Sequence, residues 1–307
     1  MEVFDRQRSL LKRRILRDRA AKTVMQTLTG VSLLILFLMG AGLYFKSAPM
    51  METHSVWKLL TDSEWSPLSG QFGFFSFILS SVYVTLLAVC IALPVSLLTA
   101  LFLTENAMSW VKKLVFPVLD ILAGIPSVVY GVWGTLIIVP FIADVLGPYF
   151  TDYTSGYTVL AGGIVLSVMI VPLLVSLFIE LFSTVPKDFR EASASLGATR
   201  WQTSRLVVLR KAMPGIIAAV VLSISKAFGE TLAVLMVCGN MVETPASLFD
   251  SCYPLPALIA NNYGEMLSMP MYESALMFAA LVMFVIIFIF NALSRVVLHR
   301  VEKSFNA

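Results

Sequence analysis

Six long apolar runs constrain this chain more than any other feature of its sequence. A helix needs about 20 apolar residues to cross the hydrocarbon core of a membrane. Only 13% of the 307 residues are charged, against about 25% in an ordinary soluble domain. The runs are Thr23–Phe45, Phe74–Leu103, Leu114–Val145, Tyr157–Phe182, Pro214–Asn240 and Tyr272–Leu298. We therefore expect an all-α integral membrane protein with six transmembrane helices and both termini on the same side.

The positive charges predict which side that is. Of the 22 Lys and Arg residues, all but Lys46, Lys58 and Lys226 fall at the ends of the runs that share a face with the two termini. Short loops rich in Lys and Arg stay in the cytoplasm. We therefore expect cytoplasmic N- and C-termini and a multi-pass membrane protein. The basic N-terminus then orients the first helix beside membrane lipid, and we expect no nucleic-acid partner.

These features divide the chain into five parts. They are a basic cytoplasmic N-terminal segment (1–22), the first transmembrane helix (23–45), a periplasmic loop (46–73), a transmembrane core (74–298) that includes a cytoplasmic loop (186–210), and a cytoplasmic tail (299–307). In the periplasmic loop, Trp57 and Trp65 either anchor at the lipid headgroups or contact a partner. Cys238 and Cys252 either pair near the outer face or remain unpaired thiols, and with Cys90 they offer no metal-ligand spacing.

A polar segment between the fourth and fifth runs carries its own helix signals. It reads PKDFREASASLGATRWQTSRLVVLRKAMP. Asp188 with Glu191 predicts a capped helix start, and Gly197 predicts a left-handed helix end. Thr199 with Gln202 predicts the capped start of a second helix. Two short helices at an angle are therefore expected on the cytoplasmic face.

The first of these helices carries Phe189 and Leu196 among its charges. Apolar side chains displayed at a membrane surface favour a partner protein that buries them. The chain has no G-x-x-x-x-G-K-[ST] segment, which is the usual phosphate loop of ATP-binding proteins. We therefore expect any ATP and Mg²⁺ to be used by a separate subunit, and this chain to bind no cofactor or metal and to have no catalytic residue.

The polar segment resembles the EAA loop of ABC importer permeases, whose pattern is E-A-A-x3-G-x9-I-x-L-P. The matching positions are Glu191, Ala192, Ser193, Gly197, Val207 and Leu209, with Ser193 for the second Ala, Val207 for Ile and Arg210 for Pro. In that family the loop forms a coupling helix that fits a groove on the ATP-hydrolysing subunit. The resemblance implies that Glu191–Gly197, with Phe189 beside them, contact such a subunit.

The third apolar run is interrupted by residues that break helices. They are Pro117, Asp120, Gly124, Pro126, Gly131, Gly134 and Pro140. Broken helix at membrane depth is tolerated only where protein or a water-filled cavity covers it, so the run is expected to line one of these. Ser127 and Tyr130 donate hydrogen bonds there either to an anion or to carbonyl groups that the breaks free. Asp120 is predicted to have a structural or gating role.

Lys226 and Glu230 are ionisable residues inside the fifth run. Because they are four positions apart, they are expected to share one face of a helix. A charge at the bilayer centre costs at least about 2.5–3.5 kcal/mol, so both should face protein or water. Two alternatives remain open. Either Lys226 meets a transported anion while Glu230 orients it, or the two neutralise each other and hold the helix against its neighbours.

Three separated segments are similar to the PstC-type permeases of the phosphate-specific ABC importer. They are Trp65–Gly73, Ala123–Gly134, and Ala227–Val234 with Gly239-Asn240. The resemblance implies a type I (MetI-like) permease fold with a pathway for inorganic phosphate. The pathway residues are then Lys226, Glu230, Ser127, Tyr130 and Thr231. Those permeases have Arg where this chain has Lys226, and Lys cannot make the bidentate fork to phosphate that guanidinium makes.

The same resemblance implies an assembly. Its other members are a second permease subunit (PstA-like), two ATP-binding subunits (PstB-like) and a periplasmic phosphate-binding protein. Other functions remain open. They are import of another oxyanion such as molybdate, sulfate or phosphonate, ion-coupled secondary anion transport through Asp120 or Glu230, and a membrane scaffold without transport. A secondary transporter needs no ATPase partner and no coupling helix, and a scaffold has no use for Lys226 and Glu230 at membrane depth.

Overall fold

The computed structural model describes residues 2–264 and 270–306. Within these residues, six helices are long and apolar enough to cross a membrane. They are Arg17–Thr53, Phe75–Asn106, Ser127–Phe150, Val159–Ser183, Arg200–Phe228 and Met271–Leu293. The all-α membrane fold with six spans is therefore confirmed.

The spans are built from regular helices that several irregular turns extend or divide. The body consists of α1 (Glu2–Thr53), α3 (Phe75–Leu101), α4 (Ser109–Gly124), α5 (Ser127–Trp133), α7 (Val159–Ser183), α10 (Leu209–Phe228), α11 (Leu232–Val237) and α13 (Pro270–Asn306). Short connecting elements are α2 (Val56–Thr61), α6 (Gly147–Phe150), α8 (Lys187–Ser195), α9 (Arg200–Thr203) and α12 (Leu255–Asn262). Strands β1 (Trp65–Ser66) and β2 (Gln71–Phe72) form an antiparallel hairpin in which Trp65 faces Phe72. The π-helical turns are Phe102–Asn106, Gly134–Ile138, Phe141–Leu146 and Ser204–Val208, and a 3₁₀ turn covers Pro67–Ser69.

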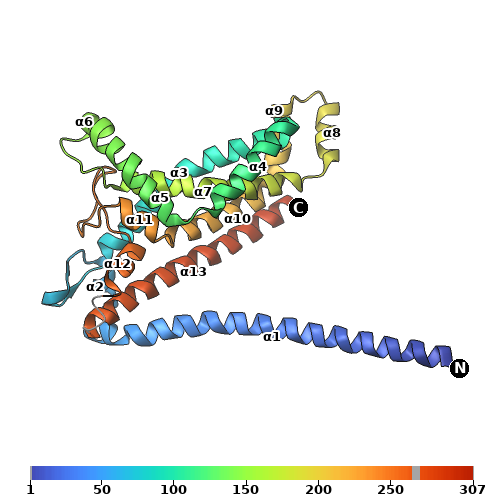
Figure 1. Ribbon diagram of the computed structural model, residues 1–307, viewed down its shortest axis with the longest axis horizontal. Helices are drawn as coiled ribbons and strands as arrows, with labels where there is room; N and C mark the ends of the chain where they lie inside the picture. The colour runs from blue at the N-terminus through green and yellow to red at the C-terminus, as the bar shows by residue number, and fades with distance from the viewer. Residues whose placement is uncertain (1, 265–269, 307) are drawn as a thin grey trace.

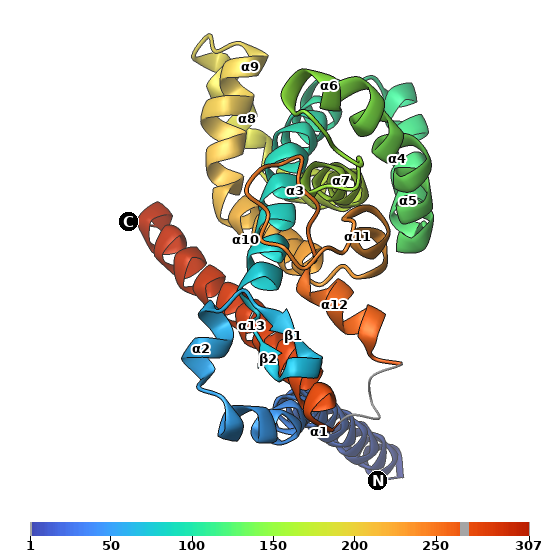
Figure 2. The ribbon, with the colours of Figure 1, turned by 90° about the vertical axis from the view of Figure 1, so that its left-hand side faces the viewer.

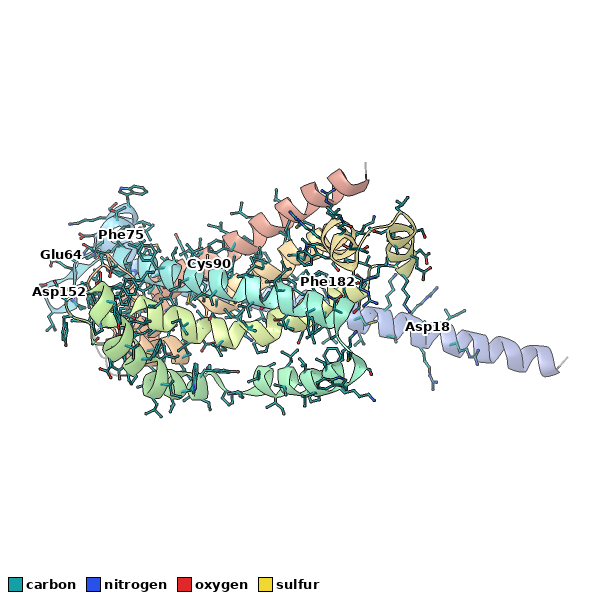
Figure 3. The ribbon with its side chains drawn as sticks, turned by 90° about the horizontal axis from the view of Figure 1, so that it is seen from above. Asp18, Glu64, Phe75, Cys90, Asp152 and Phe182 are labelled. Atoms are coloured by element: carbon teal, nitrogen blue, oxygen red, sulfur yellow. The ribbon has the colours of Figure 1, made fainter. Side chains whose placement is uncertain are left out.

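The two ends of the molecule carry different elements (Figure 1). One end holds α8, α9, the start of α1 and the end of α13, and we call it the α8 end. The opposite end holds α2, α6, α12 and the hairpin, and we call it the hairpin end; it faces the viewer in Figure 2. Figure 3 shows Glu64 and Asp152 at the hairpin end and Phe182 near the α8 end. This arrangement is the one expected for six crossings.

Helix α1 is one continuous helix through the predicted N-terminal segment, the first span and the start of the predicted loop. It meets α13 near the hairpin end and diverges from it toward the α8 end (Figure 1). Lys46 Nζ lies 2.8 Å from Glu273 Oε1 where the two helices meet. The most apolar stretch of α1 has 0% of its residues buried, so this surface is left for lipid or another chain.

Helix α7 is the centre of the main hydrophobic core. Half (50%) of its most apolar stretch is buried, and it packs along α3 and against α4, α10 and α11. Gly163 allows the close approach of α3, because a Cβ at this position would lie 2.5 Å from Leu87 Cδ2. Pro172 in α7 and Pro94 in α3 lie within otherwise continuous helices, as neighbouring helices in membranes permit.

A second core lies at the hairpin end and is organised by Trp65. Its ring centroid lies 5.7 Å from that of Phe72, 5.3 Å from Phe74 and 5.1 Å from Phe77, in edge-to-face arrangements. Such pairs stabilise beyond the area that they bury. Trp65 therefore anchors the hairpin to α3, whereas Trp57, with 76% of its surface exposed, is free for lipid or a partner.

Candidate functional site

Helix α8 is present as predicted, but Asp188 does not cap it. The residue before its first turn is Pro186, which makes no side-chain cap, and Asp188 lies inside that turn. Pro186 is extended (ψ 143°) and the chain is helical from the next residue, so the helix begins too early for Asp188 to accept its first amide groups. A carboxylate in the first turn still favours the positive end of the helix. The predicted Asp188–Glu191 capping box is therefore wrong.

The predicted end of α8 and start of α9 are confirmed. Gly197 has a φ of 81°, and the N–H of Ala198 donates to Ser193 O at 3.2 Å. The N–H of Gln202 donates to Thr199 Oγ1 at 3.3 Å, and the N–H of Thr199 donates to Gln202 Oε1 at 2.8 Å. Both halves of the capping box are present, so α9 starts at a defined angle to α8.

Ser193 has a structural role in this arrangement. Its Oγ lies 2.9 Å from Oγ1 of Thr203, which is buried at the end of α9. The Ser in place of the second Ala of the EAA pattern therefore joins the two short helices by a side-chain hydrogen bond. An Ala at this position would leave the Thr203 hydroxyl without this partner.

Arg190 attaches α8 to the ends of two membrane helices. Its Nη2 donates to Glu105 Oε1 at 2.8 Å, and its Nε lies 3.2 Å from each oxygen of that carboxylate. The guanidinium also donates to Phe182 O at 2.8 Å and to Val185 O. Glu105 lies at the end of the α3 span. The carbonyl of Phe182 lies in the last turn of α7, and that of Val185 lies just after it. Because both side chains are mostly buried, 23% and 13% exposed, this pair is a stronger tie than a surface ion pair.

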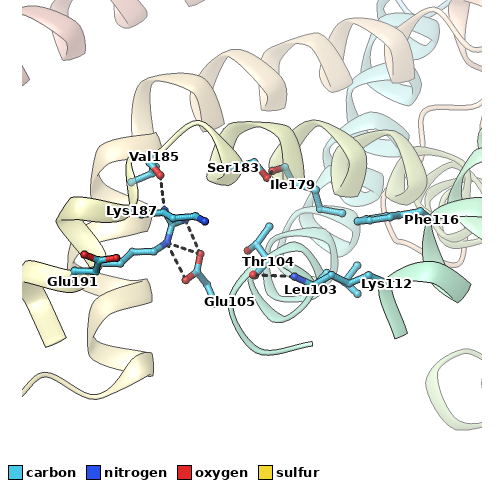
Figure 4. A pocket seen from close by; sticks show the side chains of 11 residues that line it. Leu103, Thr104, Glu105, Lys112, Phe116, Ile179, Ser183, Val185, Lys187 and Glu191 are labelled. Carbon is cyan, nitrogen blue, oxygen red and sulfur yellow. Dashed lines mark hydrogen bonds and ion pairs between the residues drawn. The ribbon is translucent and has the colours of Figure 1, made fainter. Parts of the chain in front are cut away.

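A pocket of about 490 Å³ lies beside this ion pair (Figure 4). Glu105, Lys187 and Glu191 line one side of it, and Lys112 and Phe116 of α4 line the other. The pocket separates α8 from the start of α4. Helix α8 packs against α9 and the turn 204–208, and Arg190 connects it to the ends of the α3 and α7 spans.

The outer surface of the two short helices is partly apolar. Phe189 is 44% exposed, Leu196 is 89% exposed and Trp201 is 56% exposed. Glu191 and Ala192 are exposed with them. Exposed apolar side chains rimmed by charges are typical of a protein-binding surface. Trp201 was not among the sequence candidates, although an aromatic residue beside the predicted second helix start was a usable signal.

The third run is broken between α4 and α5, as predicted. Gly124 ends α4, Ile125 and Pro126 are extended, and α5 begins at Ser127. The buried Tyr130 donates its hydroxyl to Leu122 O at 2.8 Å. Of the two alternatives, Tyr130 therefore donates its hydrogen bond to a carbonyl at the helix break. Ser127 is half-buried, and its hydroxyl makes no hydrogen bond with the described residues. Asp120 is exposed on α4.

The fifth run is also broken, and this overturns the expected arrangement of Lys226 and Glu230. Helix α10 ends at Phe228 and α11 begins at Leu232. The N–H of Glu230 donates to Ala227 O at 3.2 Å, a tighter turn than that of an α-helix. The two residues therefore do not share one helix face, and among the described residues neither forms an ion pair.

Lys226, Glu230 and Thr231 line the surface of this break. Lys226 is exposed in the single chain, and Glu230 and Thr231 are half-buried. Thr231 Oγ1 donates to Gly229 O at 3.3 Å. Because an unpaired ammonium at membrane depth must face protein or water, a surface of another chain or an aqueous path has to cover Lys226.

The two broken runs lie side by side. Thr135, which follows α5, donates its hydroxyl to Met236 O of α11 at 3.1 Å. A Cβ at Gly131 would lie 2.7 Å from Met236 Sδ, so this glycine permits the contact. The structure thus brings together two of the three segments of the PstC-like pattern, since Gly131 also lies against Ala233. Within the described residues, no hydrogen bond joins Ser127 or Tyr130 to the Lys226 group.

Two residues of the α8 end were not identified as candidates from the sequence. Glu105 lies at the end of the second run and Arg190 in the predicted first short helix, and neither carried a predicted role. A signal was available, because Glu105 is an isolated acidic residue at the end of the second run and Arg190 directly precedes Glu191. Only the fold shows that they meet.

Comparisons with known proteins agree with this geometry. Residues 92–303 match the model of the family described as "Binding-protein-dependent transport system inner membrane component". The chain is 42% identical over 240 residues to the probable ABC transporter permease protein YqgH of Bacillus subtilis, covering 78% of this chain and 76% of that one. It is 34% identical over 255 residues to the phosphate transport system permease protein PstC of Xylella fastidiosa, covering 78% of each chain.

The fold is similar to that of solved transporters. A chain of the bacterial ABC transporter that imports the acidic polysaccharide alginate superposes with a TM-score of 0.56 at 16% identity, covering 81% of this chain and 88% of that one. A chain of the inward-facing MetNI methionine ABC transporter gives a TM-score of 0.53 at 20% identity, covering 82% and 98%. At these identities the likeness concerns the fold alone.

Proposed function

Because the chain belongs to the family of binding-protein-dependent transport system inner membrane components, we propose that it is a permease subunit of an ATP-driven importer of inorganic phosphate. It forms half of the translocation pathway across the inner membrane and works by alternating access. It performs no covalent chemistry. ATP and Mg²⁺ are used by partner subunits, and the chain binds no cofactor.

The observation that carries the substrate assignment is Lys226 at the break of the fifth run, which forms no ion pair with the residues that the structure describes, in a chain similar to phosphate permeases. A positive centre at membrane depth lowers the electrostatic barrier for an anion. The exposed side of α10 that carries Lys226 is the side that a second permease subunit would cover. Glu230 and Thr231 follow in the same break, and Ser127 begins the neighbouring broken helix. Phosphate then passes between two permease subunits along these residues.

The coupling to ATP hydrolysis is assigned to α8. The segment Glu191–Gly197, which is exposed except at the half-buried Ser193, fits into a groove of an ATP-binding subunit with Phe189 and Trp201 at its sides. The Arg190–Glu105 pair makes α8 move together with the ends of α3 and α7. When the two ATP-binding subunits close, α8 would move with them and displace α3 and α7. This movement would open the pathway at the hairpin end.

The partners follow from the family. They are a second, PstA-like permease subunit, two PstB-like ATP-binding subunits and a periplasmic phosphate-binding protein. Support for the last comes from a similar fold, which was solved in the alginate transporter in complex with its periplasmic protein. The α8 end then faces the cytoplasm of a bacterium or archaeon, and the hairpin end faces the binding protein.

Uptake of radiolabelled phosphate tests the substrate. A strain that depends on this chain for phosphate uptake should take up labelled phosphate at a rate that excess molybdate or sulfate does not reduce. Displacement by either anion would favour the alternative, a permease for another oxyanion. Collapse of ion gradients at constant ATP should leave uptake unchanged, and loss of uptake would instead favour ion-coupled secondary transport.

The role of α8 is tested in the same strain. Glu191→Ala should abolish phosphate uptake and release the ATP-binding subunit, while the chain remains in the membrane. Glu180→Ala is the matched control, because Glu180 is exposed near the end of α7 and lies outside the proposed docking segment. Equal uptake by the two variants would contradict the coupling role.

A further inference from the structure

Cys238 and Cys252 meet at the hairpin end although 13 residues separate them in the chain. Cys238 follows α11, and Cys252 precedes α12. The N–H of Cys252 donates to Cys238 O at 2.8 Å, and the N–H of Asn240 donates to Cys252 O at 3.1 Å. These two bonds form a parallel bridge between Gly239 and Cys252.

The bridge places the two cysteines within reach of each other. Bridged backbones lie about 4.8 Å apart, and a disulfide accepts Cα atoms about 4.4–6.8 Å apart. Cys238 is directly next to the bridged Gly239. Both residues are free thiols in this structure. No large backbone movement is therefore needed to join them.

The surroundings hold this pair in place. Both residues are fully buried, at 0% exposure. Gly162 of α7 makes room for the Cys238 sulfur, because a Cβ at Gly162 would lie 2.6 Å from it. The segment before Cys252 is bonded to the start of α7, where the N–H of Val159 donates to Asp250 O at 3.0 Å and Ser251 Oγ donates to Tyr157 O at 2.7 Å. The pair thus sits between α11 and a segment that is fixed on α7.

We propose that Cys238 and Cys252 form an intramolecular disulfide on the outer side of the membrane. The outer compartment of a bacterial cell is oxidising enough for disulfides to persist. The reaction is an exchange with the disulfide of a thiol oxidase of that compartment. One cysteine attacks this disulfide to form a mixed disulfide, and the other cysteine then displaces the oxidase. Two thiols of the permease become one disulfide, and the oxidase leaves as a dithiol that carries both electrons and both protons.

The disulfide would close a loop of the chain that begins directly after α11, the helix that follows the Glu230–Thr231 break. It fixes the outer end of α11 to the segment before Cys252, which is itself bonded to α7. Only the end of α11 next to the Glu230–Thr231 break can then move. Since both sulfurs are buried in the folded chain, the exchange takes place before this region closes. The inference uses the outward orientation of the hairpin end but not the identity of the transported anion, so phosphate uptake tests the two proposals separately.

Alkylation of the three cysteines tests the disulfide. The chain is purified without reductant from aerobically grown cells, denatured and alkylated with N-ethylmaleimide, and its intact mass is measured. We expect one adduct, on Cys90, and three adducts when reduction precedes alkylation. Cys90→Ser is the matched control, because Cys90 lies alone on the exposed side of α3 (Figure 3). It should carry no adduct before reduction and two after it.

Peptide mapping then identifies the linked residues. A peptide pair joined through Cys238 and Cys252 supports the inference, whereas three adducts without reduction, or a link to Cys90 or to another chain, would overturn it. A stability measurement gives a second readout. Reductant should lower the unfolding midpoint of the wild-type protein and of Cys90→Ser, and should leave that of the Cys238→Ser/Cys252→Ser variant unchanged. An equal effect of reductant on all three proteins would contradict the disulfide.

Discussion

Arg190 and Glu105 are 85 positions apart in the chain, and their side chains form the ion pair that holds α8 against the ends of α3 and α7. The same guanidinium binds two carbonyl groups at the end of α7. A single side chain thus joins the proposed coupling helix to two membrane spans. Neither Phe189 nor Leu196 makes a comparable tie, because Phe189 contacts Lys211 Nζ (5.1 Å from its ring) and Leu196 is almost fully exposed.

Arg190→Lys should weaken the coupling without removing the charge. Lys keeps a positive charge but lacks the planar fork that reaches a carboxylate and two carbonyls at once. The loss of charge-assisted hydrogen bonds should cost about 1.5–3 kcal/mol. We expect a lower unfolding midpoint and less phosphate transported per ATP hydrolysed in liposomes. Arg210→Lys, at an exposed position of α10, is the control and should behave as wild type. A normal transport ratio in Arg190→Lys would show that the tie is not needed.

Lys226→Gln should reduce phosphate uptake by about 10–100-fold, because loss of a charged partner costs about 1.5–3 kcal/mol. Lys226→Arg should retain uptake, since guanidinium keeps the charge and adds a fork for phosphate. Initial uptake rates at matched expression provide the measurement, with Lys113→Gln on α4 as control. Because the structure separates Glu230 from Lys226, adding Glu230→Gln to Lys226→Gln should not restore phosphate uptake. Recovery of uptake in the double variant Lys226→Gln/Glu230→Gln would support a neutralised pair instead.

Gly197→Ala should destabilise the turn between α8 and α9 by about 1–2 kcal/mol, because an L-residue in the left-handed region is strained. The position has open space around it, with no atom within 4 Å of a built Cβ, so no clash adds to this cost. We expect release of the ATP-binding subunit in a pull-down from mild detergent. Gly197→Asn should retain more of that subunit, since Asn tolerates this region. Gly30→Ala, also with nothing within 4 Å but without a positive φ, should have no effect.

Leu196→Ala and Trp201→Ala should each weaken binding of the ATP-binding subunit. A buried aromatic or apolar anchor at the centre of an interface contributes about 2 kcal/mol or more, which is about 30-fold in affinity. Titration of the purified ATP-binding subunit onto the permease in nanodiscs measures the change. Trp57→Ala is the control, because Trp57 is as exposed but lies at the hairpin end. Equal affinities for all variants would place the docking surface elsewhere.

Asp250 predicts a pH dependence of stability at the hairpin end. Partial burial raises the pKa of its carboxyl group, but hydrogen bonds from the amide groups of Ser247 and Ala246 and from the Ser247 hydroxyl lower it further, so that the net pKa lies below the ordinary 3.8. A lowered folded-state pKa stabilises the protein above the unfolded-state pKa and stops doing so as the pH falls through the folded-state value. Asp250→Asn should therefore lower the unfolding midpoint at pH 7, and the difference from wild type should shrink as the pH falls below about 4 and vanish only below the folded-state pKa.

Thermal unfolding in detergent between pH 7 and pH 3 provides this measurement. The control is Asp152→Asn, since Asp152 is exposed at the same end and should change the midpoint little at any pH. A difference between wild type and Asp250→Asn that stays constant down to pH 3 would contradict the role of the carboxylate charge.

Much of the fold was predictable because membrane solvation acts on each run separately. A run of about 20 apolar residues has to form a helix that satisfies its own backbone, so the six spans can be read from composition and length. The Thr199–Gln202 capping box and the Gly197 helix end are equally local, because they involve residues within one turn. The break at Pro126 is local too, since Pro removes a backbone donor.

The sequence by itself determined the class of protein, the six spans, the two short helices and the presence of charge at Lys226. Only the tertiary structure decided which distant residues meet. It paired Arg190 with Glu105, placed α5 against α11, brought Cys238 to Cys252 and ended α10 at Phe228, which separated Glu230 from Lys226. The physical reason is that helix formation depends on neighbours within a few residues, whereas these contacts depend on how whole helices pack around α7, and no local pattern encodes that packing.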